Sequence, residues 1–347
     1  MNSVGKVGWG LVGASDIAAR FMIGAIRSQP DAEVVAVMSR SPQWSAEYAR
    51  IHSIPSHHTS VADLLANPDV DVVYVSSDNR LHREQTVAAA RAGKPVLCEK
   101  PLALDPADAA AMVDGCREAG VVFGTNHHLR TAAAIQTIRR VVREGIVGRP
   151  LGARVSHLTN LPEHLRKWRI KEPAAGGGPI NDMGTHDFDA LRFILGADIV
   201  DVTAMTVSQG LAAAGIEDGV MASLRFDGGL LASFHAAYNI GFAGSALDVY
   251  GTEGSLLCRN AMSATGGAEL VLRTAAGDRA VDIGPQGLAY EGTVRAFIDA
   301  VRGRGEPAAT GFDGLQSLLV ATAVRESARS GRAVAISNLM ALAREES

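Results

Sequence analysis

The chain has 347 residues, of which 47% are apolar and 20% charged, and its formal net charge is −4. This length predicts two globular domains, and the weak negative charge argues against a nucleic-acid or membrane partner. Cys98, Cys116 and Cys258 are scattered, so we expect no disulfide framework and a cytoplasmic location. No apolar run is long enough to cross a membrane, and Met1–Gly10 lacks the apolar core of a signal peptide.

The first part of the chain predicts a strand, a glycine turn and a helix. Val7–Val12 is an apolar, β-prone run, and a helical apolar pattern follows the turn. Small residues at Gly13, Ser15 and Ala18 have the spacing of a dinucleotide-binding fingerprint, with serine in its middle position. We expect the pyrophosphate of a dinucleotide at the residues Gly13, Ala14, Ser15, Asp16 and Ile17. By itself this degenerate motif fits an ordinary strand–helix turn equally well.

The end of the second predicted strand bears on the choice of cofactor. Glu33–Met38 is followed by Ser39, Arg40 and Ser41, where an NAD-specific site usually has an acidic residue for the ribose 2′-hydroxyl. A guanidinium between two hydroxyls suits a 2′-phosphate instead. The sequence therefore favours NADP(H), with NAD(H) left open. The competing interpretation is that Arg40 is a solvated surface residue.

Polar segments follow the next three predicted strands, Val70–Ser76, Pro95–Cys98 and Val121–Gly124. Ligands bind at the carboxyl ends of parallel strands, so we expect cofactor contacts there. The candidates are Ser76, Ser77, Asn79, His82, Glu99, Lys100 and Asn126. Asn79 and His82 could equally cap a helix, and a structural hydrogen bond explains His128 as well as ligand contact does. Helices are predicted for Ser60–Ala66 and after Asp105, which precedes Pro106.

The pattern changes after a helix predicted for Ala132–Glu144. Consecutive β-prone runs with short polar turns predict an α+β domain with a large, mostly antiparallel sheet. The runs are Leu151–Leu158, Ile199–Val207, Gly219–Phe226, Leu230–Tyr238, Leu247–Tyr250 and Ser255–Arg259. Asp227-Gly228-Gly229 reads as a hairpin turn. Helices would cover one face of the sheet, and a second copy of the chain could cover the other, so a homo-oligomer is an option.

These patterns predict a dinucleotide-binding α/β domain over residues 1–125 and an α+β substrate domain over residues 126–347. Apolar-faced helices predicted for Ala289–Val301 and Leu315–Ala328 could pack back on the first domain. Tyr290 is a weak candidate for the rim of the substrate pocket.

The chemistry of the second domain centres on residues 161–195. Trp168-Arg169 and a glycine run precede a predicted helix that carries Asp182 and His186 four residues apart, on one face. An exposed pair of this kind is common in helices, but the glycine run lets this helix begin close to a ligand. Asp182 and His186 could suggest a metal site. No convincing third ligand is evident, so we expect no bound metal.

The chain resembles the glucose-fructose oxidoreductase/inositol dehydrogenase/rhizopine-catabolism (Gfo/Idh/MocA) family. The resemblance rests on Gly13–Ala18, Asp71–Val75, Asn79–His82, Glu99–Ala103 and the Asp182/His186 pair. It implies a Rossmann domain, an α+β domain and an NAD(P)-dependent oxidoreductase acting on a sugar CH–OH or C=O group. Trp9–Ser15, Thr125–Arg130, Trp168-Arg169 and Glu217–Met221 are most similar to the NADPH-dependent keto-sugar reductases of this family. Arg40, Trp44 and Met183-Gly184-Thr185 depart from that pattern.

For catalysis, the resemblance implies that Lys100 polarises a carbonyl and that His186 is the general acid or base. Asp182 would orient His186 or bind a substrate hydroxyl, and Glu99 could hold Lys100 in place. The substrate-binding residues would be His128, Trp168, Arg169, Asp182 and His186, with Asn126 and His127 nearby. Three alternatives stay open: a polyol or inositol dehydrogenase, an NAD-dependent glycosidase, and a non-catalytic, NADP-sensing regulator.

Overall fold

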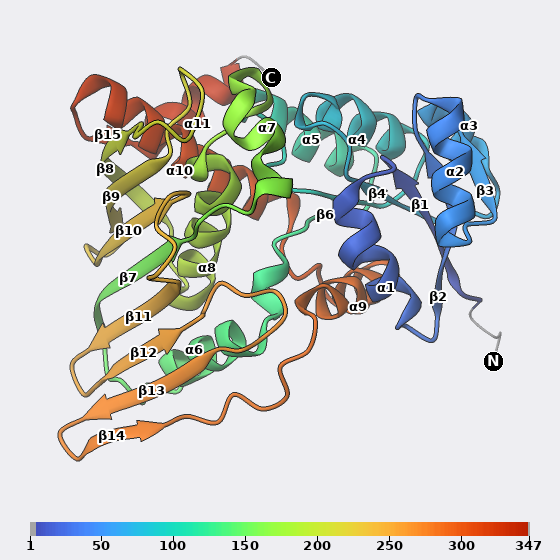
Figure 1. Cartoon of the computed structure of the whole chain (residues 1–347). Helices are drawn as coiled ribbons and strands as arrows, with labels where there is room; N and C mark the ends of the chain where they lie inside the picture. The colour runs from blue at the N-terminus through green and yellow to red at the C-terminus, as the bar shows by residue number, and fades with distance from the viewer. Residues whose placement is uncertain (1–4, 346–347) are drawn as a thin grey trace. The chain divides into compact units, whose positions relative to one another are not determined.

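The computed structural model describes residues 5–345, which form two compact units (Figure 1). Of the described residues, the first unit holds residues 5–128 together with Tyr290–Leu315, and the second holds Leu129–Ala289 and residues 316–345. The boundary lies slightly beyond the expected position at residue 125. The chain returns to the first unit over Tyr290–Leu315. Met1–Val4, the start of the expected lead-in, lie outside the described residues.

The first unit is built on a six-stranded parallel sheet with the order β3-β2-β1-β4-β5-β6. β1, β4 and β5 are buried along their whole length, which explains their continuous apolar sequences. The strands are β1 (Val7–Val12), β2 (Ala32–Met38), β3 (Ser56–His58), β4 (Val72–Val75), β5 (Val96–Cys98) and β6 (Phe123–Thr125). The predicted α/β fold is confirmed, and the segments that follow the parallel strands emerge at one edge of the sheet.

Helices connect these strands, and their ends show ordinary capping chemistry. They are α1 (Ile23–Arg27), which continues a π-helical turn at Ala18–Met22, α2 (Pro42–His52), α3 (Val61–Ala66), α4 (His82–Arg91) and α5 (Pro106–Glu118). The carboxylate of Asp105 accepts the N–H of Ala107 at 2.8 Å and Pro106 is the first residue of α5, as predicted. The predictions did not include α2 or β3.

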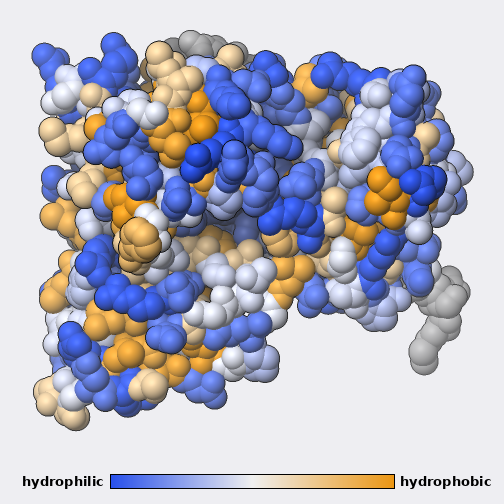
Figure 2. Space-filling view, viewed as in Figure 1, coloured by the Kyte–Doolittle hydropathy of each residue, from blue (hydrophilic) through white to orange (hydrophobic). Residues whose placement is uncertain are grey.

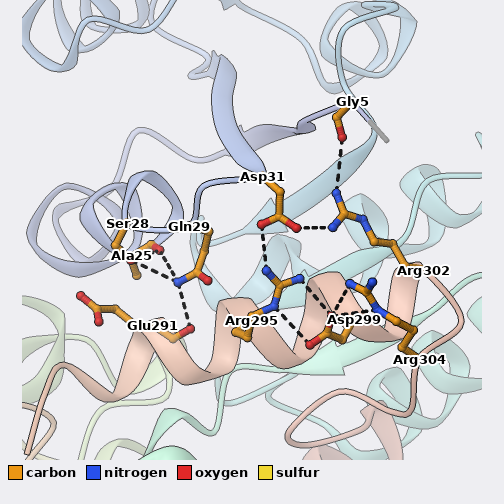
Figure 3. Close-up of polar contacts among 10 residues, drawn as sticks. All are labelled: Gly5, Ala25, Ser28, Gln29, Asp31, Glu291, Arg295, Asp299, Arg302 and Arg304. Atoms are coloured by element: carbon orange, nitrogen blue, oxygen red, sulfur yellow. Dashed lines mark hydrogen bonds and ion pairs between the residues drawn. The ribbon is translucent and has the colours of Figure 1, made fainter. Parts of the chain in front are cut away.

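The returning segment is fixed to the first unit by an ion-pair network around α9 (Ala289–Val301), shown in Figure 3. Arg295 and Arg302 both bind Asp31, which directly precedes β2, and Arg295 Nη1 lies 2.8 Å from Asp31 Oδ1. Arg295 also pairs with Asp299 at 3.0 Å. Hydrogen bonds from the two guanidinium groups keep the pKa of Asp31 below its ordinary value.

The second unit contains a nine-stranded sheet with the order β14-β13-β12-β11-β7-β10-β9-β8-β15. Its strands are β7 (Pro150–Leu158), β8 (Ile199–Val207), β9 (Gly219–Phe226), β10 (Leu231–Ala237), β11 (Ser245–Gly251), β12 (Ser255–Arg259), β13 (Glu269–Thr274), β14 (Gly277–Ala280) and β15 (Val334–Ala335). All neighbours are antiparallel except β7 and β10, so the predicted mostly antiparallel sheet is confirmed. The predicted hairpin turn joins β9 to β10, with Gly228 and Gly229 both at positive φ.

Helices cover one face of this sheet and leave part of the other face exposed. The helices are α6 (Ala133–Arg143), α7 (Arg166–Lys171), α8 (Thr185–Leu195), α10 (Gly311–Ser330) and α11 (Ile336–Glu345). Along β9, Leu224 and Phe226 are buried, whereas Met221 is 58% exposed and pairs across strands with the exposed Met205. The surface in Figure 2 shows apolar residues interspersed with hydrophilic ones over this sheet. Between residues 5 and 345, no helix combines the length and apolar character needed to cross a membrane.

Candidate active site

The glycine turn after β1 is closely packed against the turn that follows β4. Gly13 has a φ of +113°, and a Cβ added to it would lie 2.8 Å from the backbone nitrogen of Ser77. Ser15 Oγ accepts the N–H of Ala18 at 3.2 Å and lies 2.8 Å from Ser76 Oγ. The turn passes directly into a helix, an arrangement that presents backbone N–H groups to an anion.

Two aromatic residues of α2 hold the carbonyl groups of this turn. Trp44 Nε1 donates to the Ala14 carbonyl oxygen at 3.1 Å, and the Tyr48 hydroxyl donates to the Ser15 carbonyl oxygen at 2.9 Å. Tyr48 is buried, whereas Trp44 is 45% exposed. Neither was predicted as a site residue, although Ser41 and Pro42 form a recognisable helix start that would have placed both on one helix face.

Ser39 and Arg40 follow β2 at the same edge of the sheet as the glycine turn. Ser39 is partly buried, and its Oγ accepts the N–H of Ser41 at 3.4 Å. Arg40 is exposed. Since Met38 of β2 pairs with Val12 of β1, Ser39 and Arg40 follow β2 next to the point where the turn at Gly13 follows β1.

The segment after β4 contains the predicted residues Ser76, Ser77, Asn79 and His82. The buried ring of His82 lies between two backbone oxygens, with Nδ1 3.1 Å from the Pro101 carbonyl oxygen and Nε2 3.3 Å from that of Ser77. Burial lowers the pKa of His82. These contacts favour a role for His82 in joining the turns after β4 and β5. Asn79 is half-buried at the start of a short 3₁₀ turn.

The buried carboxylate of Glu99 organises the end of β5. Its Oε1 accepts hydrogen bonds from the Tyr74 hydroxyl and, at 2.5 Å, from Asn126 Nδ2. Its Oε2 accepts the backbone N–H of Lys100 at 3.3 Å. Burial raises the pKa of Glu99 despite these donors. Glu99 therefore holds the backbone N–H of Lys100 and the side chain of Asn126.

Asn126 follows β6 and is completely buried. Its amide nitrogen donates to Glu99, but no donor among residues 5–345 reaches Asn126 Oδ1. A buried acceptor without a partner is costly unless a ligand supplies a donor.

His128 belongs to a stack of aromatic rings in the first unit. Its ring lies 4.2 Å from that of Tyr290, at an angle of 18°, and the other neighbour of Tyr290 is Phe21 at 5.0 Å. Burial, together with the charge of Lys100, lowers the pKa of His128 to about 3. His128 is therefore neutral at physiological pH, and His127 beside it is also buried.

In the second unit, Asp182 is the centre of a polar cluster. Its Oδ2 accepts a hydrogen bond from Arg169 Nε at 2.7 Å and another from the Tyr238 hydroxyl at 3.0 Å. Trp168, from the same short helix α7, has its ring 4.7 Å from the Arg169 guanidinium. The structure thus brings together three predicted site residues, and it adds Tyr238, which no motif in the sequence marks.

The sequence predicts a regular helix that carries Asp182 and His186, but the structure is not α-helical throughout this segment. Residues Ile180–Gly184 form a π-helical turn, and His186 lies in the first turn of α8. His186 is 7% exposed. Asp182 therefore lies in the π-helical turn and His186 in the α-helix that follows it.

Buried ion pairs hold α8 against its neighbours. Asp187 lies 3.1 Å from His157 Nδ1 of β7, and Asp189 accepts two hydrogen bonds from Arg130, at 2.8 and 2.7 Å. Among the described residues, no group of three or more His, Cys, Asp and Glu side chains is arranged to hold a metal ion.

Both units match known sequence families. Residues 7–127 match the oxidoreductase family with an NAD-binding Rossmann fold, and residues 135–257 match the GFO/IDH/MocA C-terminal domain. The chain belongs to the GFO/IDH/MocA oxidoreductase family. The predicted family and the predicted NAD(P)-dependent oxidoreductase class are therefore confirmed.

Two relatives with sugar-related enzyme names match 94% and 80% of this chain. A 1,5-anhydro-D-fructose reductase of Ensifer adhaerens is 49% identical over 94% of this chain and 98% of its own length. A myo-inositol 2-dehydrogenase of Thermotoga maritima is 30% identical over 80% of this chain and 83% of its own. Among solved structures, an aldose-aldose oxidoreductase of Caulobacter crescentus superposes with a TM-score of 0.87 at 28% identity, covering 95% of this chain and 99% of that one.

Proposed function

We propose that this protein is an NADPH-dependent keto-sugar reductase that converts 1,5-anhydro-D-fructose to 1,5-anhydro-D-mannitol. The observation that carries the proposal is the 49% identity, over nearly the full length of both chains, to a 1,5-anhydro-D-fructose reductase. Lys100, Asp182 and His186 provide the polar groups that a carbonyl reduction requires.

The first unit fits a nicotinamide dinucleotide. A side chain at Gly13 would collide with the backbone of the turn after β4. Glycine at this position leaves the loop backbone accessible to the pyrophosphate. The unpartnered Oδ1 of Asn126 suits a donor of the nicotinamide amide or ribose. Ser39 and Arg40 would bind the 2′-phosphate, which supports NADPH over NADH.

In the proposed reaction, bound NADPH supplies a hydride to the carbonyl carbon of the sugar. Lys100, whose backbone N–H is held by Glu99, donates a hydrogen bond to the carbonyl oxygen and stabilises the negative charge that develops there. His186 then gives its proton to this oxygen. Asp182 binds a sugar hydroxyl while Arg169 and Tyr238 hold its carboxylate in place.

A polyol dehydrogenase is the second candidate, favoured by the 30% identity to a myo-inositol 2-dehydrogenase. Steady-state kinetics with 1,5-anhydro-D-fructose, other 2-keto sugars and myo-inositol, each with both cofactors, separates the two. We expect the highest kcat/KM for 1,5-anhydro-D-fructose with NADPH. A higher value for oxidation of a polyol would refute the assignment.

Lys100→Ala tests the mechanism, with Lys94→Ala as a matched control. Lys94 binds the backbone carbonyl of Val70 at 2.5 Å and lies outside the proposed site. We expect Lys100→Ala to lower kcat at least a hundredfold, because an oxyanion donor contributes about 3 kcal/mol or more to transition-state stabilisation. Retention of wild-type turnover in Lys100→Ala would contradict the role of Lys100.

The proposal includes a cytoplasmic homo-oligomer formed through the exposed face of the nine-stranded sheet. Met205, Met221 and Leu231 are large apolar side chains that remain exposed on this face. Sedimentation velocity of the wild type and of Met205→Glu/Met221→Glu measures the association, and identical, monomeric behaviour of both would refute it.

A further inference from the structure

A cavity of about 340 Å³ lies between the end of β8 and the last turns of α10, within the second unit. It is lined by Ile180, Thr206, Val207, Ser208, Gly215, Ile216, Glu217, Arg325, Ala328 and Arg329. Its volume is within the range of small-molecule sites. None of the residues assigned above to cofactor binding or catalysis lines it.

The lining combines cationic groups, hydroxyls and an apolar floor. Arg325 and Arg329 are four residues apart on α10. Thr206 is the second-last residue of β8, and Ser208 directly follows the strand. Ile180 and Ile216 are buried beneath them. Burial raises the pKa of Glu217, so its carboxyl group is less readily charged than a free one and repels an anion less.

The walls of the cavity are fixed relative to each other. Ser327 Oγ accepts the backbone N–H of Ala204 at 2.9 Å and donates to the carbonyl oxygen of Arg332 at 2.7 Å, which ties α10 to β8. Arg329 pairs with Glu326, three residues earlier on α10, at 2.8 Å. Both guanidinium groups therefore belong to a helix that is anchored to the sheet, and not to a loop.

Two hydrogen bonds connect this cavity to the helix that carries Asp182. Glu217 Oε1 accepts the N–H of Ile180 at 3.2 Å, at the start of the π-helical turn. Arg325 donates to Oδ1 of Asn181, whose Nδ2 donates to the Gly176 carbonyl oxygen at 3.1 Å. A ligand that engages Arg325 or Glu217 therefore acts on the residues directly before Asp182.

We propose that this cavity is an effector site for a phosphate monoester of a small polyol. The guanidinium pair binds the phosphate by charge-assisted hydrogen bonds, and Thr206, Ser208 and Glu217 bind hydroxyl groups of the ligand. When the ligand binds, Arg325 donates its hydrogen bond to the phosphate instead of to Asn181. The turn that holds Asp182 then loosens, and the KM for the sugar rises. This second effect, unlike the binding itself, rests on the proposed function.

Isothermal titration calorimetry with glucose 6-phosphate tests the site, on the full chain saturated with NADP⁺ so that the cofactor's own phosphate sites are occupied. We expect saturable binding that Arg325→Gln/Arg329→Gln weakens at least tenfold, and no binding of glucose under the same conditions. Arg279→Gln, which removes an exposed arginine of β14, is the control with the same change of residue type. Absence of binding to the wild type, or equal affinities of the wild type and the double variant, would overturn the proposal.

Ala328→Leu is a second variant that keeps both arginines and fills part of the cavity. This substitution should also weaken the binding of glucose 6-phosphate at least tenfold. If the double variant does not fold, wild-type affinity of Ala328→Leu would overturn the proposed site. For the coupling, glucose 6-phosphate should raise the KM for 1,5-anhydro-D-fructose at least twofold and leave the KM for NADPH unchanged. Binding of glucose 6-phosphate with an unaltered KM for the sugar would refute the coupling but not the site. Absence of reductase activity in the wild type would refute only the proposed function.

Discussion

Gly13→Ala is a direct test of how the nucleotide-binding turn is built. Alanine at a φ of +113° is strained by about 1–3 kcal/mol, and its Cβ would lie 2.8 Å from the backbone nitrogen of Ser77 and 2.9 Å from the carbonyl carbon of Ser76. Backbone atoms cannot rotate away as a flexible side chain can, so the contact adds to the strain. We expect a total loss of about 3 kcal/mol, which lowers Tm by roughly 6–12 °C for a unit of this size.

Differential scanning calorimetry measures this Tm, and NADPH fluorescence titration measures the accompanying loss of affinity, which we expect to be at least tenfold. Gly24→Ala is the matched control. Gly24 lies in α1, no atom would come within 4 Å of its added Cβ, and alanine is favoured over glycine inside a helix by about 0.5–1 kcal/mol. A wild-type Tm and NADPH affinity for Gly13→Ala would show that this turn has room for a side chain and is not closely packed.

Three further substitutions test separate parts of the site. Arg40→Ala should raise the KM for NADPH by about 10- to 100-fold and leave that for NADH unchanged, because a hydrogen bond to a charged group contributes about 1.5–3 kcal/mol; equal effects on both cofactors in steady-state assays would exclude a 2′-phosphate contact. Tyr238→Phe removes a hydrogen-bond donor to Asp182 and should lower kcat/KM for the sugar about tenfold, with NADPH affinity, measured by fluorescence, unaltered. His128 has a pKa lowered to about 3 from 6.5, so the unfolded chain binds its proton more readily and stability falls as pH falls through this interval. His128→Phe keeps an aromatic ring against Tyr290 and should remove about 2 kcal/mol of the difference in unfolding free energy between pH 7.5 and pH 5; an unchanged pH dependence in denaturant titrations would show that His128 is not held neutral.

Local patterns in the sequence predicted most elements of the fold. The bounds of β1, β8, β9, β12 and α9 agree with the predicted runs, because each combines a clear apolar period with a glycine or polar residue at its ends. β13 and β14 were not predicted. β13 pairs with both β12 and β14, whereas β14 (Gly277–Ala280) lies at the edge of the sheet and is exposed throughout, so no apolar alternation marks β14.

The candidate site was predictable only in part. The loops after the strands of the first unit could be located, since parallel strands bring their carboxyl ends to one edge. The partners of these residues could not: Tyr238 lies 56 positions from Asp182, and the contact between Trp44 and Ala14 depends on a helix that was not predicted. The π-helical turn at Ile180–Gly184 also has no local sequence signature that distinguishes it from an α-helix.

The ion-pair network between Asp31 and α9 has a consequence for how the protein is made. The nucleotide-binding unit is completed by Tyr290–Leu315, which begins about 160 residues and ends about 190 residues after His128, where its first segment ends. At synthesis rates of about 5–20 residues per second, the ribosome needs roughly 10–40 s to deliver this segment. During that interval the partner surface of α9 around Trp9, whose ring lies 5.5 Å from that of Phe297, is uncovered. The nascent chain therefore exposes an apolar patch that chaperones can bind until its last quarter has been translated.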